Sequence, residues 1–270
     1  MTHSPNVLWL SVSPHLKCFD QRLLSQLAQV TSVQLWEYSQ TADEPCCIDI
    51  AVASLHDYLK DRPYKTHLLG HGVSGMVALL YARRYPQQVA SLTLLSVAAL
   101  PAVNWQSHYY ALRQLLPCSR EMVLAHMTRL LFGEQSARFT RACTHLLAQD
   151  LDSNLTLHSL ADHAKIPPGA TAVPLLICNG EMDAIARAQQ QPLWKDWIAG
   201  DASEKQCSDG NSSFRLWHCP GGHHFFHFQQ AAIVANRIAD YWQQVSVQNQ
   251  QRLVGDRLNS SEHNQVSTQL

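Results

Sequence analysis

The chain lacks a strong excess of charge, a long apolar run and any regular spacing of cysteines. Its 270 residues hold 20 Lys and Arg against 21 Asp and Glu, which gives a formal net charge of −1. A near-neutral chain has no electrostatic attraction for nucleic acid or for an anionic membrane, so we expect neither partner. The first apolar run, Val7–Val12, is short and follows no basic segment. We therefore expect no membrane span and no secretory leader.

The eight cysteines are scattered, and none of them forms a C-x-x-C pair. This spacing favours neither a disulfide framework nor a structural zinc site, and it predicts a reducing, cytoplasmic compartment. His223 and His227 are four residues apart, as two metal ligands on one helix face would be. However, the preceding Pro220, Gly221 and Gly222 favour a loop, and no acidic ligand lies nearby in the sequence. We therefore expect no metal and no other cofactor.

What the chain does contain is a globular composition, 46% hydrophobic and 15% charged, with short apolar runs separated by segments of helical periodicity. This alternation is typical of parallel strands joined by crossover helices. Strands are expected at residues 6–12, 33–36, 67–69, 89–96, 173–178 and 214–218, and helices at 19–30, 48–60, 74–85 and 228–243. The segment 245–270, rich in Gln, Asn and Ser, is expected to be disordered or loosely attached.

The strand pattern disappears between about residues 99 and 168. Three helical patterns take its place, over residues 105–116, 120–132 and 137–149. A helical insertion at this point would cover a pocket at the end of the sheet. We therefore expect an α/β core made of residues 1–98 and 169–244, with a helical cap over residues 99–168.

The most informative segment runs from Thr66 to Pro86, where an apolar strand leads through a Gly-rich turn straight into a helix. This order resembles the nucleophile elbow of α/β-hydrolases, which holds the serine of a G-x-S-x-G motif. Gly70 takes the place of the first glycine, and Gly72 stands where the serine is expected. The resemblance therefore implies the scaffold for nucleophilic catalysis without its nucleophile.

Glycine suits this position, because an elbow forces its central residue into a strained backbone region that glycine adopts without penalty. Ser74 is the alternative nucleophile. In that register the helix would begin too early, and Met76 would stand where a small residue is required. We expect Ser74 instead to cap the first helical turn, or to fill the small-residue position where helix and strand pack.

Two further segments carry the resemblance to the α/β-hydrolase fold family. The resemblance covers roughly residues 6–244 and implies a mostly parallel sheet of about six strands flanked by helices. The stretch VPLLICNGEMD resembles the strand and loop that supply the triad acid, which would be Asp183. The stretch PGGHHFFH resembles the loop that supplies the triad histidine, which is His224 or His223 depending on the alignment. We favour His224, because it leaves His227 at the position of the family's frequent second histidine.

The same resemblance implies a degraded oxyanion hole. Family members present His-Gly after their first buried strand, and an N–H from that loop joins one from the residue after the nucleophile. Here the pair is Ser11-Val12, followed by Ser13 and Pro14. Val12 lacks the flexibility of glycine and Pro14 has no N–H, whereas Val73 can still donate. Val12 and Val73 are therefore the expected oxyanion and pocket residues.

Three functions remain open. The first is a non-hydrolytic member of the fold that binds a small molecule or a protein, since losing a triad serine removes about six orders of magnitude in kcat. The second is an enzyme in which Asp183 and His224 act as a general base on water or on an acidic C–H. The third is an esterase or thioesterase altered at the nucleophile.

Overall fold

The computed structural model describes residues 6–38, 47–99, 103–152, 171–186, 194 and 214–266. In this part of the chain one six-stranded sheet has the order β2-β1-β3-β4-β5-β6, and every neighbouring pair is parallel. The strands are β1 (Val7–Ser11), β2 (Val33–Glu37), β3 (Thr66–His71), β4 (Val89–Leu95), β5 (Leu175–Gly180) and β6 (Phe214–Cys219). The expected parallel sheet of about six strands is confirmed.

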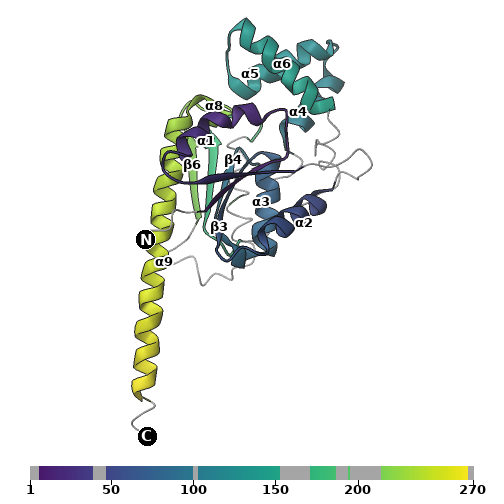
Figure 1. The fold of residues 1–270 in the computed structure, drawn as a ribbon. Coiled ribbons are helices and arrows are strands. Elements are labelled where there is room, and N and C mark those ends of the chain that lie inside the picture. Colours follow the sequence, from purple (N-terminus) through teal and green to yellow (C-terminus); the bar gives the residue numbers. More distant parts are fainter. Residues whose placement is uncertain are drawn as a thin grey trace.

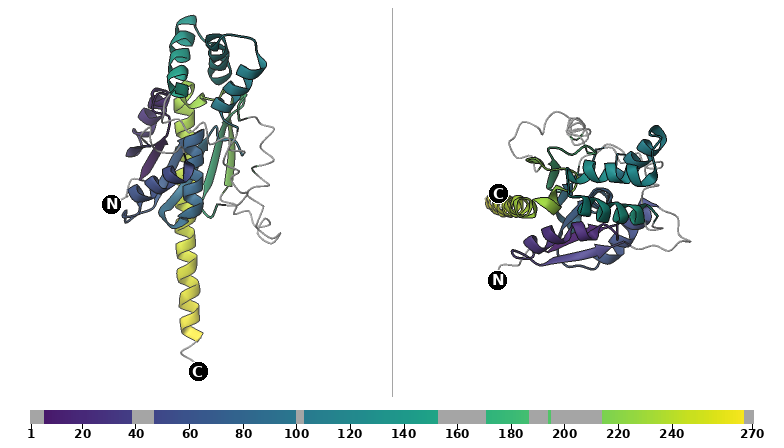
Figure 2. Two further views of the ribbon diagram at one scale, coloured as in Figure 1. Left: turned by 90° about the vertical axis from the view of Figure 1, so that its right-hand side faces the viewer. Right: turned by 90° about the horizontal axis from the view of Figure 1, so that it is seen from above.

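Helices cover both faces of this sheet (Figures 1 and 2). On one face lie α1 (Gln21–Leu27), preceded by the short η1 (Lys17–Phe19), and α9 (Ala231–Val266). On the other face lie α2 (Ile48–Leu59) and α3 (Val73–Arg84), the latter followed by η2 (Pro86–Gln88). The one-turn helix α8 (Phe226–Gln229) follows β6 and precedes α9.

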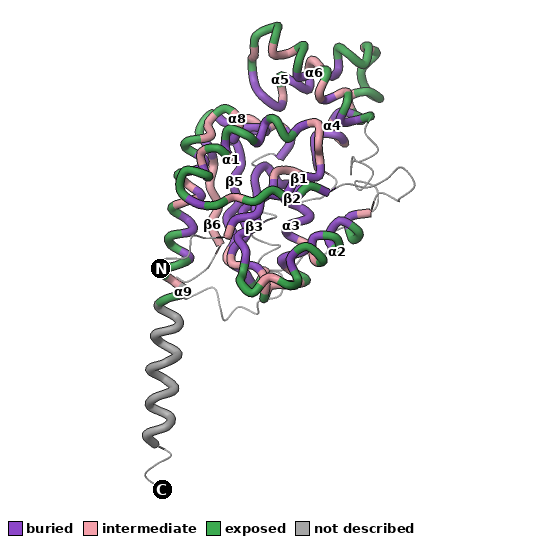
Figure 3. The backbone as a smooth tube through the Cα atoms, in the orientation of Figure 1, coloured by how far each residue is buried: buried purple, intermediate pink, exposed green. Residues whose placement is uncertain are grey.

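The core consists of two apolar layers, one on each side of the sheet. Along β1 the side chains alternate, so that Leu8 and Leu10 pack toward α2 and α3 while Val7 and Trp9 pack toward α1 and α9. All of β1 and β5 is buried, as Figure 3 shows for the middle of the molecule. Continuous burial is the reason these strands read as unbroken apolar runs, since both faces of a parallel sheet are covered.

Three helices connect β4 to β5 in the described residues: α4 (Trp105–Leu115), α5 (Arg120–Phe132) and α6 (Ala137–Asp152). They pack through an apolar cluster against the loop that follows β6. In that cluster the rings of Phe132 and Phe225 stack 4.8 Å apart, and the Phe225 N–H donates to the Leu131 carbonyl at 3.1 Å. The three helices therefore lie at the edge of the sheet where the strands end (Figure 1).

Two helices differ from the expected bounds. The pattern over residues 19–30 divides into η1 and the shorter α1. The segment 245–270, expected to be disordered or loosely attached, contains the continuation of α9 to Val266, and residues 267–270 lie outside the described part. The segment 231–266 contains no proline and a single glycine, Gly255, so no residue in it forces the helix to end. None of the described helices is both long enough and apolar enough to cross a membrane.

A buried carboxylate links α6 to α4. Asp150 is fully buried, and Gln106 Nε2 donates to its Oδ2 at 3.3 Å. The other oxygen, Oδ1, has no hydrogen-bond partner among the described residues. Burial raises the pKa of Asp150 to about 7, although the hydrogen bond from Gln106 acts in the opposite direction.

We expect Asp150→Asn to stabilise the protein at pH 8. The pKa of Asp150 is about 7 when folded and about 3.9 when unfolded. Between these values the unfolded chain releases a proton that the folded chain keeps, so stability falls as pH rises through this window. Urea unfolding should show Asp150→Asn to be more stable than wild type by about 1–4 kcal/mol at pH 8, with little difference at pH 4.5.

The matched control is Asp152→Asn on the same helix. Asp152 is exposed and pairs with Arg120 at 2.7 Å, so its loss should change stability by less than about 1 kcal/mol at either pH. An Asp150→Asn protein whose advantage does not grow between pH 4.5 and pH 8 would contradict the raised pKa.

Candidate active site

Gly72 alone makes the turn between β3 and α3. Its backbone has φ 54° and ψ −124°, a conformation that L side chains rarely adopt, and its N–H donates to the Leu95 carbonyl at 3.0 Å. Apart from Gly72 and its two chain neighbours, no heavy atom of the described residues lies within 4 Å of the point where a Cβ on Gly72 would stand. The backbone of this turn is therefore strained for any residue other than glycine, but there is open space where a side chain would begin.

Two further glycines allow β3 and α3 to approach closely. A Cβ on Gly70 would lie 2.6 Å from the backbone nitrogen of Gly75, and a Cβ on Gly75 would lie 2.8 Å from the Gly70 carbonyl oxygen. Neither position has room for a side chain. This contact fixes the start of α3 directly against the end of β3, which holds Gly72 in its turn.

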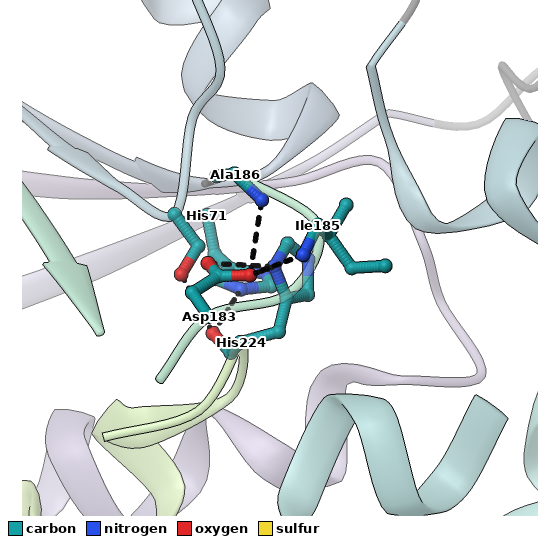
Figure 4. A network of polar contacts seen from close by, with 6 residues as sticks. His71, Asp183, Ile185, Ala186 and His224 are labelled. Atoms are coloured by element: carbon teal, nitrogen blue, oxygen red, sulfur yellow. Dashed lines mark hydrogen bonds and ion pairs between the residues drawn. The ribbon is translucent and has the colours of Figure 1, made fainter. Parts of the chain in front are cut away.

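Asp183 and His224 meet at the ends of β5 and β6 (Figure 4). His224 Nδ1 lies 3.0 Å from Oδ2 and 3.2 Å from Oδ1 of Asp183. Asp183 Oδ1 also accepts the N–H groups of Ile185 at 2.8 Å and Ala186 at 3.0 Å. Both side chains are almost completely buried. The structure thus brings together the two residues that the resemblance assigns to a triad.

The charge of this pair is set by its surroundings. Burial raises the pKa of Asp183, but the attraction of His224 and hydrogen bonds from His224 and from the Ala186 N–H outweigh it, and the net shift in pKa is downward. The ionised carboxylate holds Nδ1 of His224. Asp183 does not contact the other ring nitrogen, Nε2. His224 also lines a pocket with Gly72, so Nε2 is the atom of this ring that could act on a ligand there.

The alternative histidine, His223, lies elsewhere. It packs at the end of α5, where a Cβ on Gly133 would collide with its ring. His227 contacts a different element, since its Nε2 lies 3.1 Å from Asp20 Oδ1. In the described part of the chain, no group of three or more His, Cys, Asp and Glu side chains could hold a metal ion.

Two residues that the sequence did not indicate anchor the His224 backbone. Ser96 Oγ donates to the His224 carbonyl at 2.7 Å, and His71 Nε2 donates to the same oxygen at 3.1 Å. Burial, followed by the charges of His227 and His224, holds the pKa of His71 well below its usual range. Ser96 has φ 47°, a strained conformation for a residue with a Cβ. The sequence could have indicated both residues by their positions at the ends of β3 and β4, because parallel sheets gather functional side chains at the ends of their strands.

A pocket lies between these strand ends and α4. Gly72, Val73 and Ser74 form one wall, and Asn104, Trp105 and Gln106 belong to another. Its remaining polar lining includes Ser11, Ser13, Asp20, His71, Ser96 and His224, and its apolar lining includes Leu16, Ile48, Met76 and Phe225. One cavity therefore brings together the Gly72 turn, His224, which Asp183 holds from behind, and the first helix of the segment 103–152.

Val73 lines this pocket, whereas Val12 does not. The Val12 N–H donates to Ser74 Oγ at 3.1 Å, so this amide is not available to a ligand. Ser74 makes no hydrogen bond that caps α3; it ties α3 to the loop after β1 instead. The expectation that Val12 is a pocket residue is therefore wrong, and the pocket is lined instead by Ser11 at the end of β1 and by Ser13 in the loop after it.

The sheet order, the flanking helices and the strand-end site place the chain in the α/β-hydrolase fold class. Similar solved structures include a bacterial membrane phospholipase A, with a TM-score of 0.70, 15% identity and coverage of 91% of this chain and 81% of that one. Proline iminopeptidase from Mycobacterium smegmatis has a TM-score of 0.64 at 14% identity, covering 92% of each chain. An esterase from Thermogutta terrifontis has a TM-score of 0.60 at 18% identity, covering 90% and 91%. At such identities the likeness shows the fold alone.

Within this class the chain belongs to the family that includes the uncharacterized protein alr2406 of Nostoc sp. strain PCC 7120. The two are 38% identical over 243 residues, which cover 90% of this chain and 92% of the Nostoc protein. The uncharacterized protein sll0249 of Synechocystis sp. strain PCC 6803 is likewise 38% identical over 242 residues, covering 90% and 92%. No model of a protein family matches the chain.

We expect a strongly downfield ring N–H proton in the NMR spectrum of the wild-type protein. The proton between His224 Nδ1 and the Asp183 carboxylate lies in a buried, charge-assisted hydrogen bond, which deshields it. His224→Gln and Asp183→Asn should each remove this resonance. His223→Gln is the matched control and should retain it. A resonance that survives His224→Gln but is lost in His223→Gln would reverse the assignment of the histidine.

Proposed function

We propose that the protein is a non-hydrolytic α/β-hydrolase-like protein that binds a small molecule in the pocket at Gly72. The observation that carries this proposal is the glycine itself, with φ 54° in the turn where the fold family holds its nucleophile. Without a serine hydroxyl at this position, serine-type hydrolysis loses about six orders of magnitude in kcat. The open space at Gly72 and the polar lining leave room for a ligand.

Two other hydroxyls of the pocket, those of Ser74 and Ser96, support the same proposal. Ser74 Oγ accepts the Val12 N–H, and Ser96 Oγ donates to the backbone carbonyl of His224. In the described structure neither hydroxyl is hydrogen-bonded to the His224 ring, as a nucleophile paired with its base would be. Each has a structural role that explains its presence.

The proposal includes a cap over residues 99–168 on a core of residues 1–98 and 169–244. It is supported by the packing of α4, α5 and α6 at the ends of the strands, and by the pocket lining that Asn104, Trp105 and Gln106 contribute. Residues 100–102 and 153–170 lie outside the described part, so the cap is argued from residues 103–152. A cytoplasmic location also belongs to the proposal, since the six described cysteines are free thiols.

The second candidate function is catalysis without serine. It is favoured by the Asp183–His224 pair, which keeps a separation of 3.0 Å in a buried site. In this role the His224 ring would take a proton from water, from a hydroxyl or from an acidic C–H of a ligand held beside Gly72. Buried acid–imidazole pairs are common at functional sites, and this supports catalysis without serine as the second candidate function.

Gly72→Ser tests the proposed loss of the nucleophile. We expect it to lower the free energy of unfolding by about 1–3 kcal/mol, because a residue with a Cβ is strained at this φ. Hydrolysis of p-nitrophenyl acetate should be at background in wild type and weak in Gly72→Ser. The new hydroxyl would stand near His224, but the Val12 N–H is already bound to Ser74. A missing oxyanion donor costs about 10²–10³ in kcat.

Gly221→Ser is the matched control. Gly221 also has a positive φ, 62°, and open space at its Cβ position, so the substitution imposes similar strain outside the pocket. It should lose comparable stability and gain no activity. Wild-type turnover well above background would contradict the proposal. A fast Gly72→Ser esterase would instead favour the third interpretation, a hydrolase altered only at its nucleophile.

A further inference from the structure

A buried carboxylate other than Asp183 lines the pocket itself, that of Asp20. Asp20 immediately precedes α1 and is 9% exposed. Trp9 Nε1 donates to its Oδ2 at 3.0 Å, and His227 Nε2 lies 3.1 Å from its Oδ1. A carboxylate has about four lone-pair sites, so Asp20 keeps acceptor capacity beyond these two contacts.

One imidazole, that of His227, contacts Asp20 in the described structure. His227 is fully buried, and its Nδ1 has no hydrogen-bond partner among the described residues. The neighbouring His71 ring lies 4.7 Å from that of His227 between centroids, and burial keeps the pKa of His71 well below the usual range. His71 therefore does not supply a positive charge at neutral pH.

No Lys or Arg of the described chain forms an ion pair with Asp20. Its one ion-pair contact there is with His227. The nearby basic side chains have other partners, since Lys17 pairs with Glu37 at 3.0 Å and Arg22 lies over the Phe228 ring. The amino end of α1 offers only a partial charge. A buried carboxylate without a counter-ion is costly, and a cation that enters the pocket would relieve that cost.

We propose that the pocket takes a small organic ammonium ion whose charged end is bound by Asp20. Leu16, Trp105 and Phe225 line the same cavity and would hold the apolar part of the ligand. The two aromatic rings also favour a cation, because their faces carry partial negative charge. This inference rests on the proposed binding function and names the ligand class for that same pocket.

Three probes of matched shape test the inference on the full chain: hexylamine, 1-hexanol and hexanoate. Hexylamine, like the lysine side chain, is protonated at pH 7. In calorimetric titrations we expect wild type to bind hexylamine about tenfold more tightly than 1-hexanol, with hexanoate weakest, because the ammonium makes a charge-assisted hydrogen bond.

Asp20→Asn should lower the affinity for hexylamine about tenfold and leave that for 1-hexanol unchanged. Asp57→Asn is the charge control, because it removes an exposed carboxylate that does not line the pocket. It should change neither the affinity for hexylamine nor that for 1-hexanol.

Equal binding of hexylamine and 1-hexanol by wild type would overturn the inference, as would binding of none of the three probes. A preference for hexylamine that survives Asp20→Asn would also overturn it. If Asp20→Asn does not fold, the wild-type ranking of the probes decides alone. Binding of the alcohol or the acid without a preference for the amine refutes the ammonium site but leaves the binding function standing. Ester turnover by wild type refutes the non-hydrolytic function without touching the amine preference.

Discussion

The passage from β3 into α3 within a single residue is the constraint around which the site is arranged. Gly70 and Gly75 leave no space between strand and helix, so Gly72 must turn the chain at φ 54°. This turn places the first residues of α3 at the edge of the sheet, beside the loops that carry Asp183 and His224. A side chain at this position would point into the pocket, and in this chain that space is empty of protein atoms.

Two buried carboxylates, each paired with an imidazole, lie at this edge of the sheet, and one of them, Asp20, lines the pocket. The Asp183 carboxylate lies against His224 and accepts two backbone N–H groups, so its charge is well solvated by the protein. Among the described residues, the side chains that contact the Asp20 carboxylate are Trp9 and His227. His71 lies between the two pairs and donates to the His224 carbonyl. Asp183 therefore orients a histidine, whereas Asp20 has no Lys or Arg counter-ion in the described part of the chain.

Much of this arrangement could be predicted from the sequence. The apolar runs identified all six strands, and the three segment resemblances led to Gly72, Asp183 and His224. The rest depends on contacts between distant positions. Asp20 and His227 are 207 residues apart, and nothing in either local segment indicates the other. The hydrogen bond from the Val12 N–H to Ser74 spans 62 residues, so the resemblance that made Val12 an oxyanion residue did not indicate it. The composition of the segment after Val245 did not indicate that α9 continues there.

The central claim is that no side chain in this pocket serves as a nucleophile, although the surrounding fold is that of a hydrolase. Intact-protein mass spectrometry of wild type after incubation with a fluorophosphonate, which reacts with activated serines, tests this claim most directly. The account predicts that the mass stays that of the unmodified chain. A stoichiometric phosphonyl adduct that peptide mapping places on a pocket serine, such as Ser74 or Ser96, would contradict it.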